Sequence, residues 1–237
     1  SQKVKVWAGG RMRYLQVKTT NLYDESGKVS RMVGSIEDVT DMENDMLKLQ
    51  KEARTDLLTG AMNRAAGTSA INRMLVQELH PGCVNTFAIV DLDNFKTLND
   101  VMGHMWGDRA LCEVVLIMKK HCRAQDIVCR LGGDEFVVFL PDMTREAAEE
   151  SLRVLSAKLH IDYVKENLEV MISASMGIVF SDGRDITFQD LYEEADGCLY
   201  QVKRTFKGSY HISDRADRVK ADQGSSCKKY AMKYRHK

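Results

Sequence analysis

The chain has 237 residues, of which 44% are hydrophobic and 29% charged; this balance indicates a folded globular protein and excludes a disordered chain, a collagen-like repeat and a disulfide-dense miniprotein. Lysine and arginine number 34, as do aspartate and glutamate, so the formal charge is zero and we expect no nucleic-acid partner, which usually requires a basic excess. The longest apolar run, Val114–Met118, is far shorter than the roughly 20 residues that cross a bilayer, so we expect no membrane segment in this chain.

The six cysteines predict a reducing compartment. None forms a Cys-x-x-Cys pair or clusters with histidine at zinc-ligand spacing, and Cys112 and Cys198 fall within apolar helical patterns that are typical of buried thiols. The first residues lack the apolar core of a secretory leader. We therefore expect a cytoplasmic protein, and the sequence leaves open whether a membrane anchor lies upstream.

Residues 1–40 alternate in the manner of β-strands. The expected strands are Lys3–Ala8, Arg11–Tyr23 and Val29–Val39, separated by a Gly-Gly turn and by the turn sequence at residues 24–28. Three strands enclose only a thin core, so we interpret this segment as the last part of a larger domain.

From Val39 the apolar period becomes that of a helix. Thr40, with Glu43 three residues later, predicts a capping box at its start. The seam spans only about two heptads, which leaves two interpretations: an amphipathic connector packed on its own domain, or a short parallel coiled coil that joins two chains. The residues of this seam are Val39, Met42, Met46, Leu49 and Ala53.

The rest of the chain alternates between strands and helices. The order β-α-β-β-α-β predicts an α/β (α+β) domain of the ferredoxin-like, split βαβ type. A polar tail, basic after Gly224, follows from residue 213; we expect it to be solvated, with a membrane or partner contact as the minority alternative. The expected elements are a helix at 63–79, a strand at 86–93, a helix to about 122, strands at 127–131 and 135–140, a helix from 144 to about 164, a strand at 169–180 and a helix at 188–203.

Acidic residues end the first buried strand of this domain. Asp93 suits a cap on the following helix, whereas a buried carboxylate at Asp91 needs a partner because desolvation of its charge is costly. Gly132 and Gly133 predict a tight hairpin whose backbone N–H groups can approach a ligand closely, and acidic residues follow it directly. In a split βαβ sheet this hairpin lies beside the first strand, so we expect Asp91 and Asp134 to converge on a site for Mg²⁺ and phosphate, as in two-metal phosphoryl transfer.

At this point the sequence resembles the GGDEF domain of diguanylate cyclases. The resemblance runs in family order over about residues 54–212 and implies a palm-type cyclase domain, with helices around a central, mainly antiparallel sheet. The matching stretches are 56–64, 91–96, Asn99-Asp100, Gly103-His104, Gly107-Asp108, Arg130–Phe136, Ser175–Gly177 and Glu194–Asp196, with Tyr200 and Lys203.

The resemblance implies an enzyme, a nucleotidyltransferase, that condenses two GTP molecules into cyclic di-GMP and two pyrophosphates within a homodimer. The 3′-hydroxyl of each GTP attacks the α-phosphate of the other. The implied metal ligands for Mg²⁺ or Mn²⁺ are Asp91, the Leu92 carbonyl, Asp134 and Glu135, and Glu135 is also a candidate base. The implied phosphate contacts are Lys96, Gly132, Gly133, Lys203 and Lys207.

Two further pairs match the family's pattern. Asn99 and Asp108 match the pair that reads guanine; a carboxylate accepts from guanine N1–H and N2–H₂, and adenine would leave it unpaired. Arg123 and Asp126 match an inhibitory site for the product. One departure concerns Lys207, which stands where the family usually has arginine, so that a point charge replaces a planar fork.

Residues 1–40 resemble the last three strands of a PAS sensor domain. We therefore expect partial PAS-like strands at 1–40, a signalling helix at 41–54, the cyclase domain at 55–212 and the tail at 213–237. Two alternatives to an active cyclase stay open: a catalytically silent GGDEF domain that binds GTP or cyclic di-GMP as a regulatory module, and a dimerisation scaffold.

Overall fold

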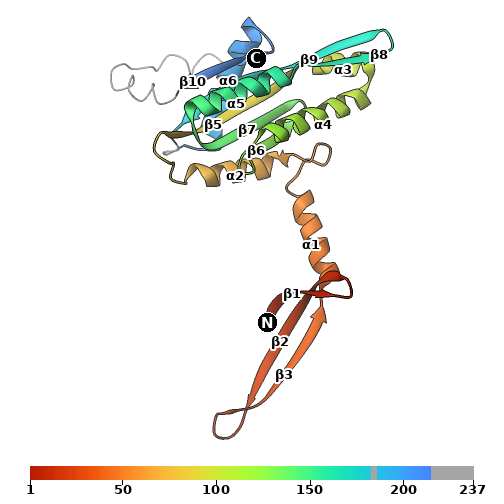
Figure 1. Cartoon of the computed structure of the whole chain (residues 1–237), viewed down its shortest axis with the longest axis vertical. Helices are drawn as coiled ribbons and strands as arrows, with labels where there is room; N and C mark the ends of the chain where they lie inside the picture. The colour runs from red at the N-terminus through yellow and green to blue at the C-terminus, as the bar shows by residue number, and fades with distance from the viewer. Residues whose placement is uncertain (183–185, 215–237) are drawn as a thin grey trace, which may run out of the picture. The chain divides into compact units, whose positions relative to one another are not determined.

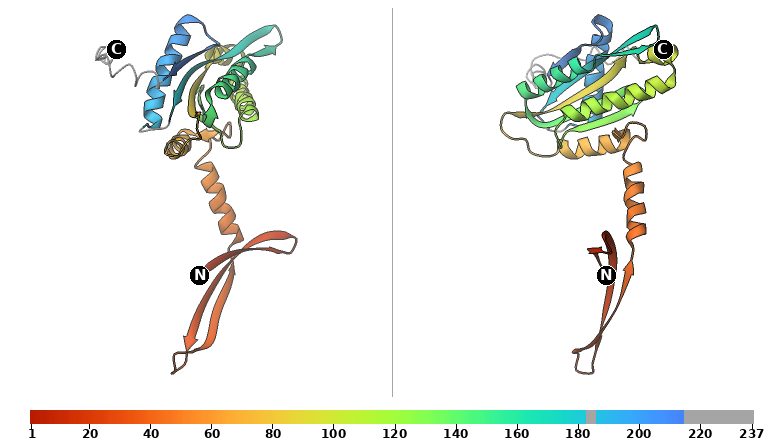
Figure 2. Two further views of the ribbon diagram at one scale, coloured as in Figure 1. Left: turned by 60° about the vertical axis from the view of Figure 1, so that its left-hand side comes forward. Right: turned by 45° about the vertical axis from the view of Figure 1, so that its right-hand side comes forward.

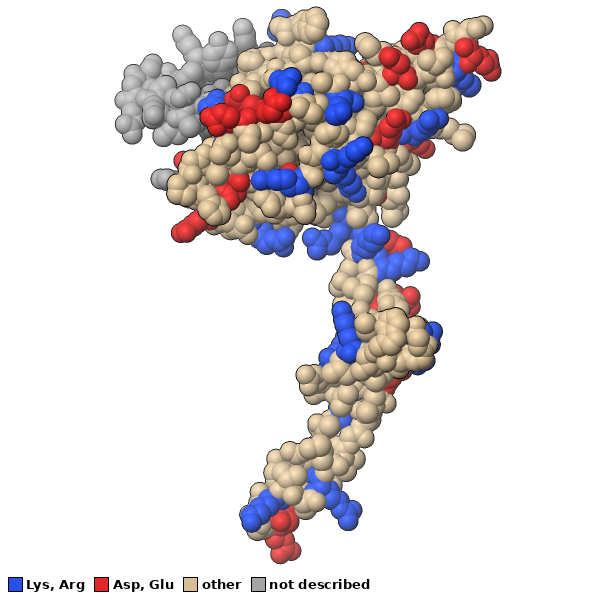
Figure 3. Space-filling view, viewed as in Figure 1, with Lys and Arg blue, Asp and Glu red and all other residues tan. Residues whose placement is uncertain are grey.

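The computed structural model describes residues 1–182 and 186–214 and divides into two compact units, one of residues Ser1–Arg54 and one that starts at Thr55 (Figure 1). Each unit is described by itself. Acidic and basic side chains are interspersed on the face seen in Figure 3. None of the helices in the described part of the chain is both long and apolar enough to cross a membrane. Of the predicted tail, residues 215–237 lie outside the described residues.

The N-terminal unit is an antiparallel sheet followed by a helix. Its strands, β1 (Gln2–Ala8), β2 (Arg11–Tyr23) and β3 (Val29–Asp38), pair in chain order, and α1 (Thr40–Glu52) follows (Figures 1 and 2). The three predicted strands and the helix are thus confirmed.

The predicted capping box at the start of α1 is wrong. The N-cap is Val39, and no side chain caps the helix. The Thr40 hydroxyl instead donates to Asp38 and accepts from the amide of Tyr14 on β2, so local pairing with the sheet competes successfully with the cap. Met46 and Leu49 of the seam lie half or more exposed on α1.

The second unit is built on a seven-stranded sheet. Its order is β10-β9-β5-β7-β6-β4, with β8 paired to β9. Only the β4–β6 and β9–β10 pairs are parallel, so the mainly antiparallel sheet of the predicted fold class is confirmed. The strands are β4 (Met62–Asn63), β5 (Cys83–Asp93), β6 (Ile127–Gly132), β7 (Glu135–Thr144), β8 (Ile161–Lys165), β9 (Leu168–Ser181) and β10 (Tyr210–Asp214).

Helices cover both faces of this sheet (Figure 2). Alternate side chains of β5 point to opposite faces, so that Val90 packs in the cluster with α3, α4 and α5, whereas Ile89 packs in the cluster with α2 and α6. Burial on both faces explains why β5 reads as a nearly continuous apolar run. The helices are α2 (Arg64–Leu75), α3 (Phe95–Met102), α4 (His104–His121), α5 (Arg145–Lys158) and α6 (Phe188–Thr205).

Three predicted helices differ from the structure. The helix expected to reach Cys122 is two helices, because Gly103, with a φ of 94°, breaks it. The helix expected to reach Val164 ends at Lys158, and the next residues form β8 because they pair with β9. The helix at 63–79 ends at Leu75. The short strands β4 and β10 were not predicted, since both exist through pairing with distant strands.

Candidate functional site

The candidate site lies where β5 ends beside the β6–β7 hairpin. In the sheet register Asp91 stands opposite Glu135 of β7 on one side and Ser175 of β9 on the other. The Leu92 amide donates to the Asp134 carbonyl oxygen at 3.3 Å. The structure thus brings Asp91 and the acidic residues of the hairpin together, and Asp91 is only 8% exposed.

An arginine holds the turn of this hairpin. Gly132 and Gly133 have φ values of 152° and 53°, which glycine adopts without strain. The Arg130 guanidinium donates to the Gly133 carbonyl at 3.0 and 2.7 Å, and to the Asp56 carboxylate at 3.0 and 3.2 Å. Arg130 therefore fixes the glycine turn to the loop before α2, which keeps the backbone of the turn open toward the site.

A pocket of about 290 Å³ adjoins these residues, and we call it the lysine pocket. Lys203 of α6 reaches into it and pairs with Asp91 at 2.6 Å between Nζ and Oδ2. Lys96 and Lys207 also line it and are exposed. Lys96 of α3, together with Lys203 and Lys207 at the end of α6 and just after it, thus lines the pocket beside Asp91 and Asp134. This arrangement suits a polyphosphate chelated to a cation. The lining residues are Asp91–Thr97, Asp134, Lys203 and Lys207.

The pKa values of two carboxyl groups at the site, those of Asp91 and Glu135, are raised. Burial raises the pKa of Asp91, Lys203 opposes this rise, and the neighbouring Asp134 and Asp93 add to it. Burial, followed by Asp91 and Asp134, likewise raises the pKa of Glu135. A site whose carboxylates resist ionisation in this way is one that a cation would stabilise.

The donor set fits a metal ion that is shared with a phosphate group. Among the described residues, no group of three or more His, Cys, Asp or Glu side chains is arranged to hold a metal ion by itself. Asp91, Asp134 and the Leu92 carbonyl are the candidate ligands near the hairpin. Mg²⁺ commonly takes one or two carboxylates and completes its shell with phosphate oxygens and water, so the residues present fit Mg²⁺ in that form.

The predicted guanine-reading residues lie on neighbouring helices, Asn99 on α3 and Asp108 on α4. The Asn99 carboxamide lies against Gly107 of α4, the residue before Asp108. A Cβ atom added at Gly107 would lie 2.0 Å from Asn99 Oδ1. The absence of a side chain at Gly107 therefore permits the Asn99 carboxamide to lie against α4 at the residue before Asp108.

The predicted role of Asp93 as a helix cap is wrong. The N-cap of α3 is Asn94, and no side chain caps that helix. The buried Asp93 carboxylate instead accepts hydrogen bonds from Ser175 Oγ at 2.8 Å, Ser173 Oγ at 3.1 Å and the Gly208 amide at 2.9 Å. These three partners lie 80 or more residues away along the chain and carry no local signal, so the sequence alone does not predict them.

Comparison of the sequence with known proteins identifies the family of this domain. Residues 53–209 match the family described as diguanylate cyclase, GGDEF domain. The chain belongs to this GGDEF family. It is 33% identical over 193 residues to the diguanylate cyclase DgcP of Pseudomonas aeruginosa, which covers 77% of this chain and 28% of DgcP. It is 27% identical over 209 residues to the cyclic di-GMP phosphodiesterase PdeB of Shewanella oneidensis, which covers 87% of this chain and 24% of PdeB.

Solved structures share the fold of this GGDEF domain. The diguanylate cyclase SiaD of Pseudomonas aeruginosa, solved with its activator SiaC, has a TM-score of 0.63 and 27% identity, covering 73% of this chain and 67% of SiaD. The coiled coil and GGDEF domain of DgcB from Caulobacter crescentus, solved with c-di-GMP, has a TM-score of 0.66 over 74% of this chain and 93% of that chain, with 22% identity. The family match starts at residue 53 and does not include residues 1–52. The resemblance of residues 1–40 to a PAS domain therefore stays a prediction.

In this GGDEF domain Arg123 and Asp126, the predicted inhibitory pair, bind each other. The Arg123 guanidinium donates to Asp126 Oδ1 at 3.0 and 2.8 Å and to the Pro141 carbonyl at 2.8 Å. The Asp126 carboxylate also accepts from the Arg123 amide at 2.7 Å, and its side chain is only 2% exposed. Asp126 therefore stabilises the turn at residues 123–126. The Arg123 side chain is 37% exposed, so it is the member of the pair that a ligand can reach.

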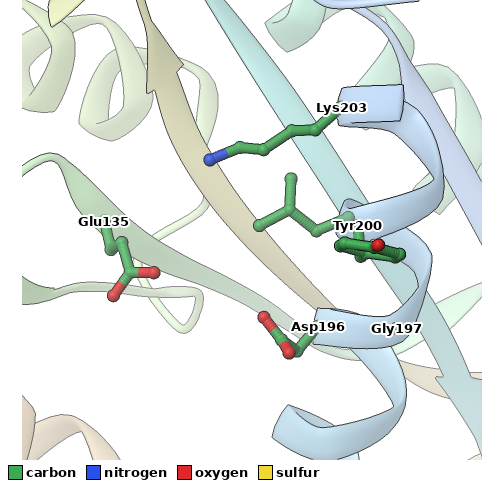
Figure 4. A pocket seen from close by; sticks show the side chains of 6 residues that line it. Glu135, Asp196, Gly197, Tyr200 and Lys203 are labelled. Atoms are coloured by element: carbon green, nitrogen blue, oxygen red, sulfur yellow. The ribbon is translucent and has the colours of Figure 1, made fainter. Parts of the chain in front are cut away.

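A second pocket of the GGDEF domain, of about 530 Å³, lies along α6, and we call it the α6 pocket. Figure 4 shows Glu135 of β7 on one side of it, with Asp196 and Lys203 of α6 pointing into the space from the other. Lys203 lines both pockets, which makes them neighbours. The lining residues are Glu135, Asp196, Gly197, Leu199, Tyr200 and Lys203.

Proposed function

We propose that this GGDEF domain is a diguanylate cyclase that condenses two GTP molecules into cyclic di-GMP and releases two pyrophosphates. The observation that carries the proposal is the lysine pocket, where Lys96, Lys203 and Lys207 face Asp91 and Asp134. This combination provides cationic contacts for phosphate oxygens and carboxylate ligands for the cation that accompanies a nucleoside triphosphate.

In the proposed complex, Mg²⁺ or Mn²⁺ is held by Asp91, Asp134 and the Leu92 carbonyl, with Glu135 beside them. When bound, the ion supplies positive charge that offsets the charge developing on the reacting phosphate. The Lys203 ammonium pairs with Asp91 in the free protein and would be available to a phosphate oxygen if a cation offset the charge of Asp91. The amides of Gly132 and Gly133 and the other two lysines hold the remaining phosphate oxygens.

Guanine is the proposed base. The Asp108 carboxylate accepts from guanine N1–H and N2–H₂, and the Asn99 carboxamide, held against Gly107, makes the second contact. Adenine offers no matching pair of donors and would leave Asp108 without its partners, which costs about 1–3 kcal/mol.

The proposed reaction needs two copies of the chain. The 3′-oxygen of each GTP forms a bond to the α-phosphorus of the other, the bond from that phosphorus to pyrophosphate breaks, and the 3′-proton passes to a base, for which Glu135 is the candidate. We propose that the α1 seam holds two copies together and that the strands at 1–40 belong to a PAS-like sensor. Product binding at Arg123 is the proposed means of inhibition.

A second candidate is a silent GGDEF domain that binds GTP or cyclic di-GMP and turns nothing over. Two observations favour keeping it. Lys207 replaces the usual arginine of the family, and the similar protein PdeB carries the name of a phosphodiesterase. In that case the same pocket binds nucleotide for regulation alone.

The deciding experiment incubates the chain, stripped of bound product, with GTP and Mg²⁺ and measures cyclic di-GMP. We expect product from the wild type and from Asp162→Asn, an exposed aspartate on β8, and none from Asp134→Asn. If the wild type makes no product, the chain fused to a strong coiled coil is assayed. Continued absence of product from this enforced dimer would contradict the cyclase proposal and favour the silent domain, and activity retained in Asp134→Asn would contradict the metal role.

A further inference from the structure

The α6 pocket has a different chemistry from the lysine pocket. It presents the carboxylates of Glu135 and Asp196, whereas its one lysine, Lys203, already pairs with Asp91 at 2.6 Å. Two carboxylates repel a phosphate group but accept hydrogen bonds from hydroxyl groups. The polar side of this pocket therefore favours an uncharged, hydroxyl-bearing ligand.

The rest of the pocket is shaped for a ring. Leu199 is buried beneath it, and the Tyr200 ring is 52% exposed with the Arg204 guanidinium 5.6 Å from its centroid. Gly197 leaves space, since no atom lies within 4 Å of a Cβ added there. A sugar ring packs well on such a surface, with its apolar face on the aromatic ring and its hydroxyls toward carboxylates.

The position of the pocket identifies which sugar. Asp134 lines the lysine pocket and the next residue, Glu135, lines the α6 pocket, so the two pockets meet at the hairpin. In the proposed complex, the nucleotide whose phosphates lie in the lysine pocket has its base at Asn99 and Asp108, on α3 and α4. These helices pack on the opposite face of the sheet from α6, so the sugar of this nucleotide lies away from the α6 pocket, which is left for the second nucleotide of the reaction.

We propose that the α6 pocket is the acceptor-sugar site of the cyclase: it receives the ribose of the GTP carried by the partner subunit, with Asp196 accepting from the 2′-hydroxyl and Glu135 from the 3′-hydroxyl. This inference rests on the proposed cyclase function and deepens it. The 3′-oxygen then approaches the α-phosphorus from the side of Glu135, loses its proton to that carboxylate and displaces pyrophosphate.

The test compares GTP with 2′-deoxy-GTP. We expect the wild type to turn over the deoxy nucleotide about tenfold more slowly in kcat, because it leaves Asp196 without its hydroxyl donor. In Asp196→Ala the GTP rate falls toward the deoxy rate, so that the ratio shrinks to within about twofold. Glu193→Ala, an exposed acidic position on the same helix outside the pocket, keeps the wild-type ratio. Unchanged discrimination in Asp196→Ala would overturn the assignment.

A second variant fills the pocket without loss of a polar group. Gly197→Leu places a side chain in the space beside Tyr200, and the helix gains a better helix former. We expect at least about tenfold slower turnover, with unchanged calorimetric binding of α,β-methylene-GTP, whose bridge cannot be cleaved. Gln201→Leu, exposed one turn further along α6, is the matched control and turns over normally.

These outcomes separate the inference from the function on which it rests. Normal turnover in Gly197→Leu, or binding of the analogue that falls together with turnover, would overturn the acceptor-sugar site and leave the cyclase standing. A chain that binds the analogue but turns over neither nucleotide, even when a fused coiled coil enforces the dimer, would contradict the cyclase proposal itself, and the acceptor-sugar site with it.

Discussion

The Gly208 amide donates a 2.9 Å hydrogen bond to the buried Asp93 carboxylate, and this bond ties the end of α6 to the end of β5. Gly208 has a φ of 74°, and a Cβ there would lie 3.0–3.1 Å from Ser173 and His160. The residue before it, Lys207, lines the lysine pocket. Asp93 thus sets the position of a phosphate-binding candidate that it does not itself touch.

Asp93→Asn should therefore raise the KM for GTP more than it lowers kcat. All three donors meet the same oxygen, Oδ2, so asparagine keeps an acceptor there but loses the negative charge. The bond to Gly208 therefore weakens, and Lys207 loses its fixed position. We expect a rise in KM of about tenfold, and steady-state kinetics measures it. Lys207→Ala should give a similar rise, and the double variant should be no worse than either single one.

Two checks isolate this coupling. Ser173→Ala removes one donor to Asp93 and leaves the Gly208 bond, so its KM should rise less. Urea unfolding shows whether the variant is folded under assay conditions, since loss of bonds to a buried charge costs about 1.5–3 kcal/mol. KM effects that simply multiply in the Asp93 and Lys207 double variant would show that Asp93 does not act through Lys207.

Gly107→Ala should weaken guanine recognition while it stabilises the domain. The added methyl group collides with the Asn99 carboxamide and turns it away, whereas alanine is about 1 kcal/mol better than glycine inside a helix. We expect the preference for GTP over ATP in equilibrium binding to fall about tenfold. In an Asn99→Ala background the same substitution should have no further effect; a further loss would place the role of Gly107 elsewhere.

The sequence predicted the features that local chemistry determines. The apolar run of β5 and the Gly132-Gly133 turn each depend on neighbours within a few residues, and both are present. The contacts that the sequence did not predict join distant segments. Lys203 reaches Asp91 and Gly208 reaches Asp93 only because the sheet places α6 beside β5, and no spacing in the sequence encodes that.

The same reason explains the wrong boundaries. The stretch after Lys158 belongs to the predicted helix, yet Ile161, Tyr163 and Val164 favour a strand, and β9 offers the edge with which they pair as β8. Asp93 has the sequence position of a helix cap, yet two serines of β9 and the amide of Gly208 compete for its oxygens. In both places the partner lies on another strand or helix end, and the local pattern alone does not predict it.

Asp56 should stabilise the domain in a pH-dependent way. Burial raises the pKa of Asp56, but hydrogen bonds from Thr59 and Arg130 outweigh it and hold the pKa below the ordinary value of 3.8. The stabilisation is therefore complete above pH 3.8 and is lost as the pH falls through the lower value in the folded state. Asp56→Asn should cost about 1–2 kcal/mol at neutral pH, and the difference from wild type should shrink below about pH 4.

Urea unfolding across this pH range measures the effect. Glu149→Gln serves as the matched control, because its ion pair with Arg145 is 43% exposed on both sides and should contribute under about 1 kcal/mol. A penalty for Asp56→Asn that is the same at neutral pH and at about pH 3 would contradict the assignment of the effect to the Asp56 charge.

Replacing Met46 and Leu49 of α1 by aspartate should abolish self-association through this helix. The two side chains are 51% and 65% exposed, and a charge at the seam opposes burial against a second copy. Sedimentation velocity measures the result. The double variant Asn44→Asp with Lys48→Asp changes two exposed residues on the face of α1 opposite the seam, and it should leave association unchanged. Unchanged sedimentation of the seam variant would contradict the coiled-coil interpretation and favour a connector helix.

Arg123→Ala should remove product binding without unfolding the turn that carries it. The bond from the Arg123 amide to Asp126 stays in this variant, whereas Asp126→Ala loses it together with the guanidinium contacts. We expect calorimetry on the stripped protein to show cyclic di-GMP binding about tenfold weaker in Arg123→Ala. Stability should fall by about 1.5–3 kcal/mol, because the buried Asp126 carboxylate loses the guanidinium contacts. Arg153→Ala, which breaks an exposed pair with Glu150, is the matched control and should bind as the wild type does. Equal binding by Arg123→Ala and the wild type would show that the Arg123–Asp126 pair serves only to hold the turn before β6.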